Sequence, residues 1–151
     1  MAEPYCAWVR YLAESFIFGA LRRGRSVEQF LGPVGPPERR GVRYVEVRAA
    51  RTSYEVYVHA VEDVGHESFL DLDSFPPFDQ NSEEEEFGQL LGRAEDPQSA
   101  LVLAEEGAGA VRGRWVNQGV VQDEYRDFVR VGRPAGMSPD GYPWPDLRTD
   151  P

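Results

Sequence analysis

Residues 54–62 alternate apolar and polar side chains along their length, and this pattern limits the fold more than any other feature of the chain. Successive side chains of a β-strand point to opposite faces, so the alternation predicts a strand with one buried face. Residues 41–49 carry a second apolar run with charged residues interspersed, which predicts another strand. The short segment 51–53 between them is typical of a hairpin, and a third strand over residues 68–72 would complete an antiparallel meander.

Four segments have apolar residues at the spacing of an amphipathic helix. They cover residues 5–24 with a short continuation over 26–31, residues 82–94, residues 96 to about 106, and residues 120–131. Ser82 with Glu85, and Asp96 before Pro97, are typical helix starts. Gly132 is a typical helix end.

These patterns predict one α+β domain over residues 1–132. Its small antiparallel sheet would be the three-stranded meander, with a candidate fourth strand over residues 111–118. The sheet would pack against the N-terminal amphipathic helix and two or three further helices. Residues 133–151 are rich in proline and are expected to form a C-terminal tail, ordered only if Tyr142 and Trp144 pack onto the domain.

Negative charge is concentrated in the middle of the chain. The 151 residues include 26 acidic and 16 basic side chains, which gives a net charge of -10, and every basic residue is arginine. Residues 54–110 hold 15 carboxylates against Arg93 alone. A field of this sign repels phosphate, so we expect no nucleic-acid partner. It attracts basic proteins, although it also suits a solvated, solubilising face.

The chain has the composition of a cytoplasmic protein. It has no run of about 18 apolar residues, so no membrane span is expected. No secretory signal is visible at the N-terminus, and the single Cys6 forms no intrachain disulfide. The abundance of Arg, Ala, Gly and Pro is typical of a GC-rich genome and suggests a bacterial source.

Carboxylates cluster between residues 62 and 86, with aromatic residues among them. The candidate partner-binding residues are Glu62, Asp63, Asp71, Asp73, Asp79, Glu83 and Glu84. Glutamates at 83–86 also favour the start of a helix, but this explains neither the aspartates nor the scarcity of basic residues. We expect a non-enzymatic domain that binds a basic protein through this surface. An immunity protein or inhibitor that neutralises a bacterial toxin is one concrete form.

A second hypothesis places a polar pocket before the last helix. Trp115, Asn117 and Gln118 would line it, with the indole as one wall. The protein would then be a small enzyme or a ligand-binding domain. The simpler interpretation makes Asn117 and Gln118 a strand end and a helix cap.

No motif for catalysis, a cofactor or a metal stands out. His59 and His66 flank the turn after residue 62 but lack metal-site spacing, and the alternation predicts that His59 is exposed. The glycines at 107, 109 and 113 follow a predicted helix and precede a strand, the reverse of a phosphate-binding loop. The sequence has no GxSxG motif. We therefore expect no catalytic residues, no metal and no cofactor.

Overall fold

The computed structural model describes residues 10–78 and 88–145 of the chain. Helices and strands follow one another in this order: α2 (Glu14–Arg22), β1 (Val27–Val34), β2 (Gly41–Ala49), β3 (Tyr54–Glu62), the 3-10 helix η1 (Leu72–Ser74), β4 (Gln89–Ala94), α3 (Pro97–Ala108), the 3-10 helix η3 (Arg112–Arg114), β5 (Val116–Asn117) and α4 (Val121–Arg130). This mixture confirms the predicted α+β class.

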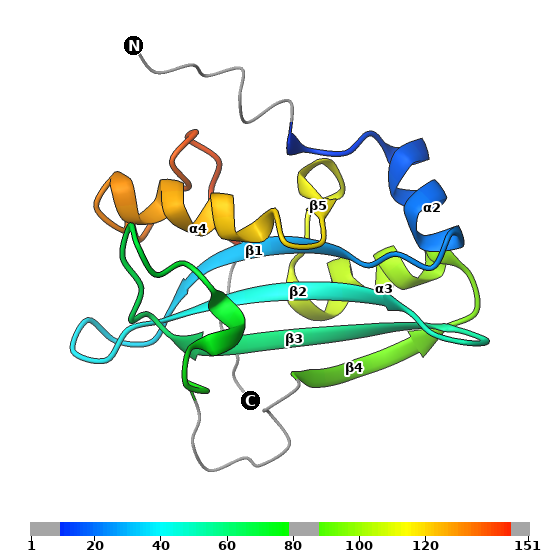
Figure 1. Cartoon of the computed structure of the whole chain (residues 1–151), viewed down its shortest axis with the longest axis horizontal. Coiled ribbons are helices and arrows are strands. Elements are labelled where there is room, and N and C mark those ends of the chain that lie inside the picture. Colours follow the sequence, from blue (N-terminus) through cyan, green and yellow to red (C-terminus); the bar gives the residue numbers. More distant parts are fainter. Residues whose placement is uncertain (1–9, 79–87, 146–151) are drawn as a thin grey trace.

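The described strands form a five-stranded sheet in the order β4-β3-β2-β1-β5, and every neighbouring pair is antiparallel (Figure 1). Strands β1 to β4 follow one another as a meander, and β5 returns to the free edge of β1. The predicted strands at 41–49 and 54–62 coincide with β2 and β3. The backbone N–H of Ala50 donates to the carbonyl of Ser53 at 2.8 Å and closes the predicted hairpin.

Residues 26–31, which the sequence predicts to be helical, begin β1 instead. This strand lies between β2 and β5 and is covered on both faces, so its apolar residues lose the period of two that marks a half-buried strand. Val27 and Leu31 enter the core on one face, whereas Phe30 enters the core on the other. In the described part of the predicted first helix, residues 11–13 are not helical and residues 14–22 form α2. Residues 5–9 of that prediction lie outside the described residues.

The prediction of a helix over residues 82–94 is wrong for its second half. Residues 89–94 form β4, and Leu90 pairs with Tyr57 of β3. Gly88 adopts a φ of +91° just before the strand, a conformation that favours glycine and interrupts a helix. The expected helix start at Ser82 lies outside the described residues.

The predicted third strand at 68–72 is also wrong. His66 and Phe69 form only an isolated bridge around a tight turn, and η1 begins at Leu72. The carboxylate of Asp71 accepts a hydrogen bond from the backbone N–H of Asp73, which stabilises the start of η1. The chain therefore crosses over one end of the sheet at this point instead of adding a strand to it.

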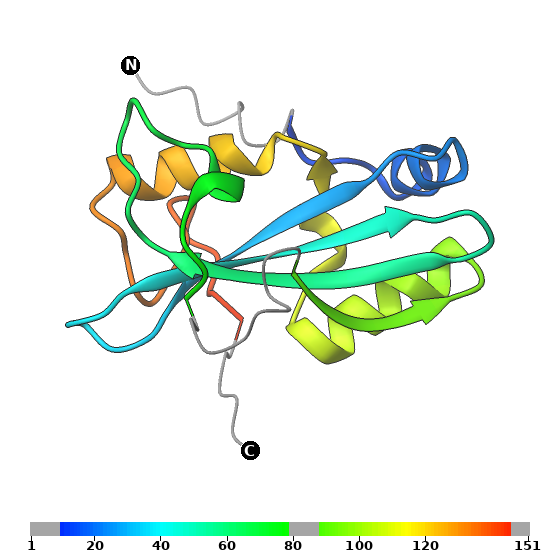
Figure 2. The ribbon, with the colours of Figure 1, turned by 60° about the horizontal axis from the view of Figure 1, so that its bottom comes forward.

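Two hydrophobic clusters cover the two faces of the sheet. On one face, α2 and α3 pack Ile17, Leu21 and Leu101 against side chains of β2 and β3. On the other face, Tyr125 and Phe128 of α4 pack against β1 and β2. Figure 2 shows α3 and α4 on opposite sides of the sheet. Both helices were expected from the sequence.

Residues 134–145 pack onto the cluster under α4. The indole of Trp144 lies 5.5 Å from the ring centroid of Phe30 and 5.9 Å from that of Phe128. Its Nε1 donates to the carbonyl of Pro134 at 2.9 Å. These contacts order the described part of the predicted tail. None of the described helices has the length and apolar character needed to cross a membrane.

Candidate functional site

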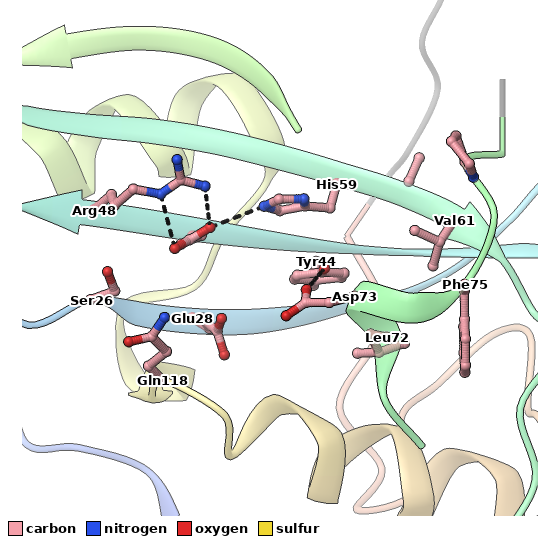
Figure 3. A pocket seen from close by; sticks show the side chains of 13 residues that line it. Ser26, Glu28, Tyr44, Arg48, His59, Val61, Leu72, Asp73, Phe75 and Gln118 are labelled. Atoms are coloured by element: carbon pink, nitrogen blue, oxygen red, sulfur yellow. Dashed lines mark hydrogen bonds and ion pairs between the residues drawn. The ribbon is translucent and has the colours of Figure 1, made fainter. Parts of the chain in front are cut away.

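Beyond the aromatic cluster under α4, the same face of the sheet holds a cavity of about 550 Å³ (Figure 3). Three carboxylates line it, those of Glu28, Glu46 and Asp73, together with the guanidinium of Arg48. The remaining walls are formed by His59 and Tyr44 on the sheet, by Ser26 and Gln118 at one side, and by the mainly apolar residues Ala60, Val61, Leu72, Phe75 and Pro77. The cavity thus joins an acidic part to an apolar part.

The negative charge of Glu46 is stabilised by hydrogen bonds with two neighbours on the cavity floor. Arg48 donates to both carboxylate oxygens, at 3.1 and 2.9 Å, and Nε2 of His59 lies 3.0 Å from Oε1. Burial acts to raise the pKa of Glu46, but the hydrogen bonds from His59 and Arg48 outweigh it and lower that pKa to about 2. Glu46 is therefore ionised at neutral pH.

His59 is not exposed as the alternation predicts, because its side chain is only 12% accessible. The imidazole stacks on Tyr44, with ring centroids 4.5 Å apart and an interplanar angle of 8°. A Cβ at Gly88 would lie 2.6 Å from the imidazole, so the backbone before β4 closes over the ring. The alternation correctly assigns His59 to the face opposite Val58, but that face is also covered.

Asp73 enters the cavity from η1. The Tyr44 hydroxyl donates to Oδ1 of Asp73 at 2.6 Å and ties this helix to β2. Burial, with the hydrogen bond to Asp73, raises the pKa of Tyr44 far above its ordinary value. Tyr44 therefore stays a protonated donor, and Asp73 remains fixed at the cavity wall.

Glu28 has the most unusual environment in the cavity. It lies directly opposite Glu46 in the β1–β2 ladder, where two like charges destabilise a sheet. The residue is 6% exposed, and one carboxylate oxygen accepts the backbone N–H of Gly119 at 2.8 Å. No arginine of the described residues forms an ion pair with it.

Burial raises the pKa of Glu28 to about 7. The charges of Glu46 and Asp73 act in the same direction, whereas the Gly119 hydrogen bond and the charge of Arg48 oppose the shift without cancelling it. Glu28 is therefore partly protonated at neutral pH. A cation placed beside it would favour its ionised form and relieve the repulsion from Glu46. This makes Glu28 the strongest single indication of a binding site in the described residues.

The predicted partner-binding carboxylates that the structure describes have different environments. Asp63 accepts from Tyr125 and pairs with Arg133 at 2.8 Å, and its side chain is only 1% accessible. Glu62 lies 3.9 Å from Arg39. Asp63 thus holds the segment after β3 against α4 and does not face a partner.

The other predicted carboxylates have different positions. Asp71 accepts the Ser74 hydroxyl at 2.8 Å and organises η1. Of the four predicted residues that the structure describes, only Asp73 lines the cavity. Asp79, Glu83 and Glu84 lie outside the described residues.

The predicted pocket residues separate across the sheet. Trp115 is fully buried in the core beside α2 and α3, and so does not line the cavity. Asn117 pairs with Val27 at the β5 edge and is exposed. Gln118 is the only one of the three that lines the cavity. Its position at the end of β5 brings it beside Glu28.

Sequence reasoning missed Glu28, Tyr44, Glu46 and Arg48 as site residues. A signal was present, because Tyr44, Glu46 and Arg48 recur every second residue and therefore share one face of β2. Glu28 gives no such signal, because the sequence analysis predicts a helix over residues 26–31. Correct placement of β1 is what brings Glu28 beside Glu46.

Comparisons with known proteins give no family for this chain. Protein-family models, curated proteins and solved structures were searched, and none matches it. No group of three or more His, Cys, Asp and Glu side chains within residues 10–78 and 88–145 is placed to hold a metal ion. The function is therefore inferred from an α+β fold whose sheet carries an acidic cavity.

Proposed function

We propose that this protein is a non-enzymatic binding protein for a basic protein partner, and that the partner inserts a cationic side chain into the cavity. The observation that carries this proposal is Glu28, a buried carboxylate opposite a second glutamate with no described ion-pair partner. An incoming cation would supply the missing counter-charge. Burial of a carboxylate without an ion-pair partner is costly, and a bound cation would offset that cost.

The shape of the cavity supports a basic side chain as the occupant. Leu72, Phe75 and Val61 offer apolar contact at one end, whereas Glu28 and Asp73 offer negative charge. Lysine and arginine side chains match this division, because their aliphatic stems bury against apolar surface and their charged ends seek polar partners.

The charge of the whole chain supports a protein partner. The net charge of -10 would steer a basic protein toward the cavity and raise the association rate. Asp79, Glu83 and Glu84 contribute to this field by their charge alone. We propose the role of a bacterial immunity or inhibitor protein that covers the basic groove of a toxin. Its single cysteine, Cys6, suits the cytoplasm, where structural disulfides are rare.

A small cationic molecule is the second candidate ligand. The cavity volume of about 550 Å³ lies in the range of small-molecule sites, and this observation favours a ligand-binding domain. Spermidine represents this class because it is a flexible amine with an aliphatic backbone. The two candidates differ in whether a peptide context is needed for binding.

The test compares binding of a labelled peptide rich in arginine and lysine to the wild type, Glu28→Gln and Glu38→Gln. Glu38 is exposed and lies outside the cavity, so its variant makes the same charge change elsewhere. We expect fluorescence anisotropy to show about tenfold weaker binding for Glu28→Gln, as for loss of one charged contact. We expect Glu38→Gln to stay close to the wild type.

Equal weakening in both variants would mean that the cavity is not the binding site. Absence of peptide binding together with Glu28-dependent binding of spermidine would favour the small-molecule candidate. Absence of both would overturn the proposal. NMR shifts of the His59 imidazole, which lines the cavity, locate any binding independently of affinity.

A further inference from the structure

We propose that the cavity selects a guanidinium group over an ammonium group, with Glu28 and Asp73 holding one arginine side chain of the partner between them. This inference rests on the proposed function and names the side chain that enters. Figure 3 shows both carboxylates directed into the same space, one from β1 and the other from η1.

Each of the two carboxylates has one oxygen engaged and one available. Glu28 accepts the backbone N–H of Gly119, and Asp73 accepts the hydroxyl of Tyr44. Both donors are neutral, so neither carboxylate has its charge compensated by the group that positions it. The second oxygen of each has no hydrogen-bond or ion-pair partner in the described part of the chain. The fold therefore orients two carboxylates toward the cavity and leaves one oxygen of each open to a donor from a ligand.

The basic side chains already in the cavity form their hydrogen bonds with Glu46 and not with these two carboxylates. Arg48 forms a bidentate ion pair with Glu46, and His59 contacts the same carboxylate. Glu46 is therefore satisfied, whereas the neighbouring Glu28 is not. The two unsatisfied oxygens come from different elements, so a ligand must reach both at once to compensate them.

A guanidinium group meets this requirement better than an ammonium group. It is planar and presents five N–H donors along its edges, so one group can bond to two carboxylates in fixed directions. An ammonium group is a compact, strongly hydrated charge with three donors and no planar edge. Removing its hydration shell in a nearly buried site such as that of Glu28 is less favourable.

The apolar wall of the cavity offers contacts for the aliphatic part of an arginine side chain. Leu72 lies next to Asp73 in η1, and Phe75 follows the same turn. An aliphatic stem that lies along these two residues would carry its guanidinium end toward Asp73 and Glu28.

The experiment titrates the wild-type protein with acetyl-arginine amide and with acetyl-lysine amide, followed by NMR. The two probes differ only in the side chain. We expect the arginine probe to bind about tenfold more tightly, as for one additional charged hydrogen-bonded contact. We expect Glu28→Gln and Asp73→Asn each to weaken arginine binding and to reduce the preference. Both replacement amides can still accept the hydrogen bonds from Gly119 and Tyr44.

Glu38→Gln serves as the charge-matched control and should keep both the affinity and the preference. Equal affinity of the two probes, with loss of both in Glu28→Gln, would overturn the guanidinium selectivity but leave the proposed function intact. A preference for arginine that survives in both cavity variants would overturn the assignment of Glu28 and Asp73. Binding of neither probe, with no binding of the basic peptide, would overturn the proposed function as well.

Discussion

Two glutamates that face each other across β1 and β2 show how far a residue's chemistry depends on its neighbours. Glu46 has Arg48 and His59 as partners and, despite burial, has its pKa lowered to about 2. Glu28 accepts the neutral Gly119 N–H and forms no ion pair within the described residues, and burial raises its pKa to about 7. Residues that break the usual rules for stability in this way are concentrated at functional sites.

Glu28→Gln should stabilise the protein at alkaline pH. The pKa of Glu28 is 4.5 in its ordinary state and about 7 in the fold, so between these values the folded state binds more protons and stability falls as pH rises. At about 1.4 kcal/mol per pKa unit, we expect the variant to exceed the wild type by a few kcal/mol at pH 8. Urea denaturation at pH 4 and pH 8 measures the difference.

At pH 4, where Glu28 is protonated in the fold, the variant and the wild type should have similar stability. Glu38→Gln, on an exposed side chain, should change the free energy of unfolding by the same small amount at both pH values. A Glu28→Gln protein that is less stable than the wild type at pH 8 would contradict the strain assigned to this carboxylate.

At the scale of elements, α3 is determined by local signals. Asp96 accepts the N–H of Ser99 at 2.8 Å as N-cap, and Pro97 occupies the first turn. Gly109 ends the helix with a φ of +80°, a conformation that only glycine adopts easily. All three features lie within the segment itself, which explains why the sequence predicts this helix correctly.

Asp96→Ala should lower the free energy of unfolding by about 1 kcal/mol, the usual cost of losing an N-cap side chain. The reason is that the Ser99 N–H then loses its acceptor. Chemical denaturation measures the change. Glu95→Ala, at the neighbouring exposed position, should have little effect, and Asp96→Ser should retain most of the stability because serine also caps helices. A large loss in Glu95→Ala would count against the capping role.

At the scale of the whole molecule, residues 134–145 contact parts of the chain that are distant in sequence. Trp144 contacts Phe30 of β1 and Phe128 of α4. The guanidinium of Arg114 lies over the rings of Tyr11 and Tyr142, at 4.7 and 4.8 Å from their centroids. The segment therefore packs against the outside of the hydrophobic cluster under α4.

Trp144→Ala should destabilise the protein by about 2 to 3 kcal/mol, less than a fully buried tryptophan because the indole is half-buried. Thermal unfolding followed by circular dichroism measures the loss. Met137→Ala, in the same segment but with a side chain 54% exposed, is the matched control and should be nearly neutral. A neutral result for Trp144→Ala would mean that the segment does not contribute to the core.

Local sequence patterns were sufficient to predict the α+β class, the β2–β3 hairpin and the helices α3 and α4. Each of these rests on a pattern within one short segment: the alternation of 54–62, the cap at Asp96, or the apolar spacing of Val121, Tyr125 and Phe128. Such patterns are local, so they are read without knowing what packs against them.

Strands β1 and β4 and the cavity depend on long-range packing. Both faces of β1 are covered, which removes the period of two, and the preference of β4 for a strand comes from pairing with β3. The cavity joins Glu28, Glu46 and Asp73, which lie far apart in the sequence. Whether a carboxylate is a solvated surface charge or a buried acceptor depends on which strands pair beside it and which loops cover it. Long-range pairing sets both, and a sequence pattern within one segment does not record it.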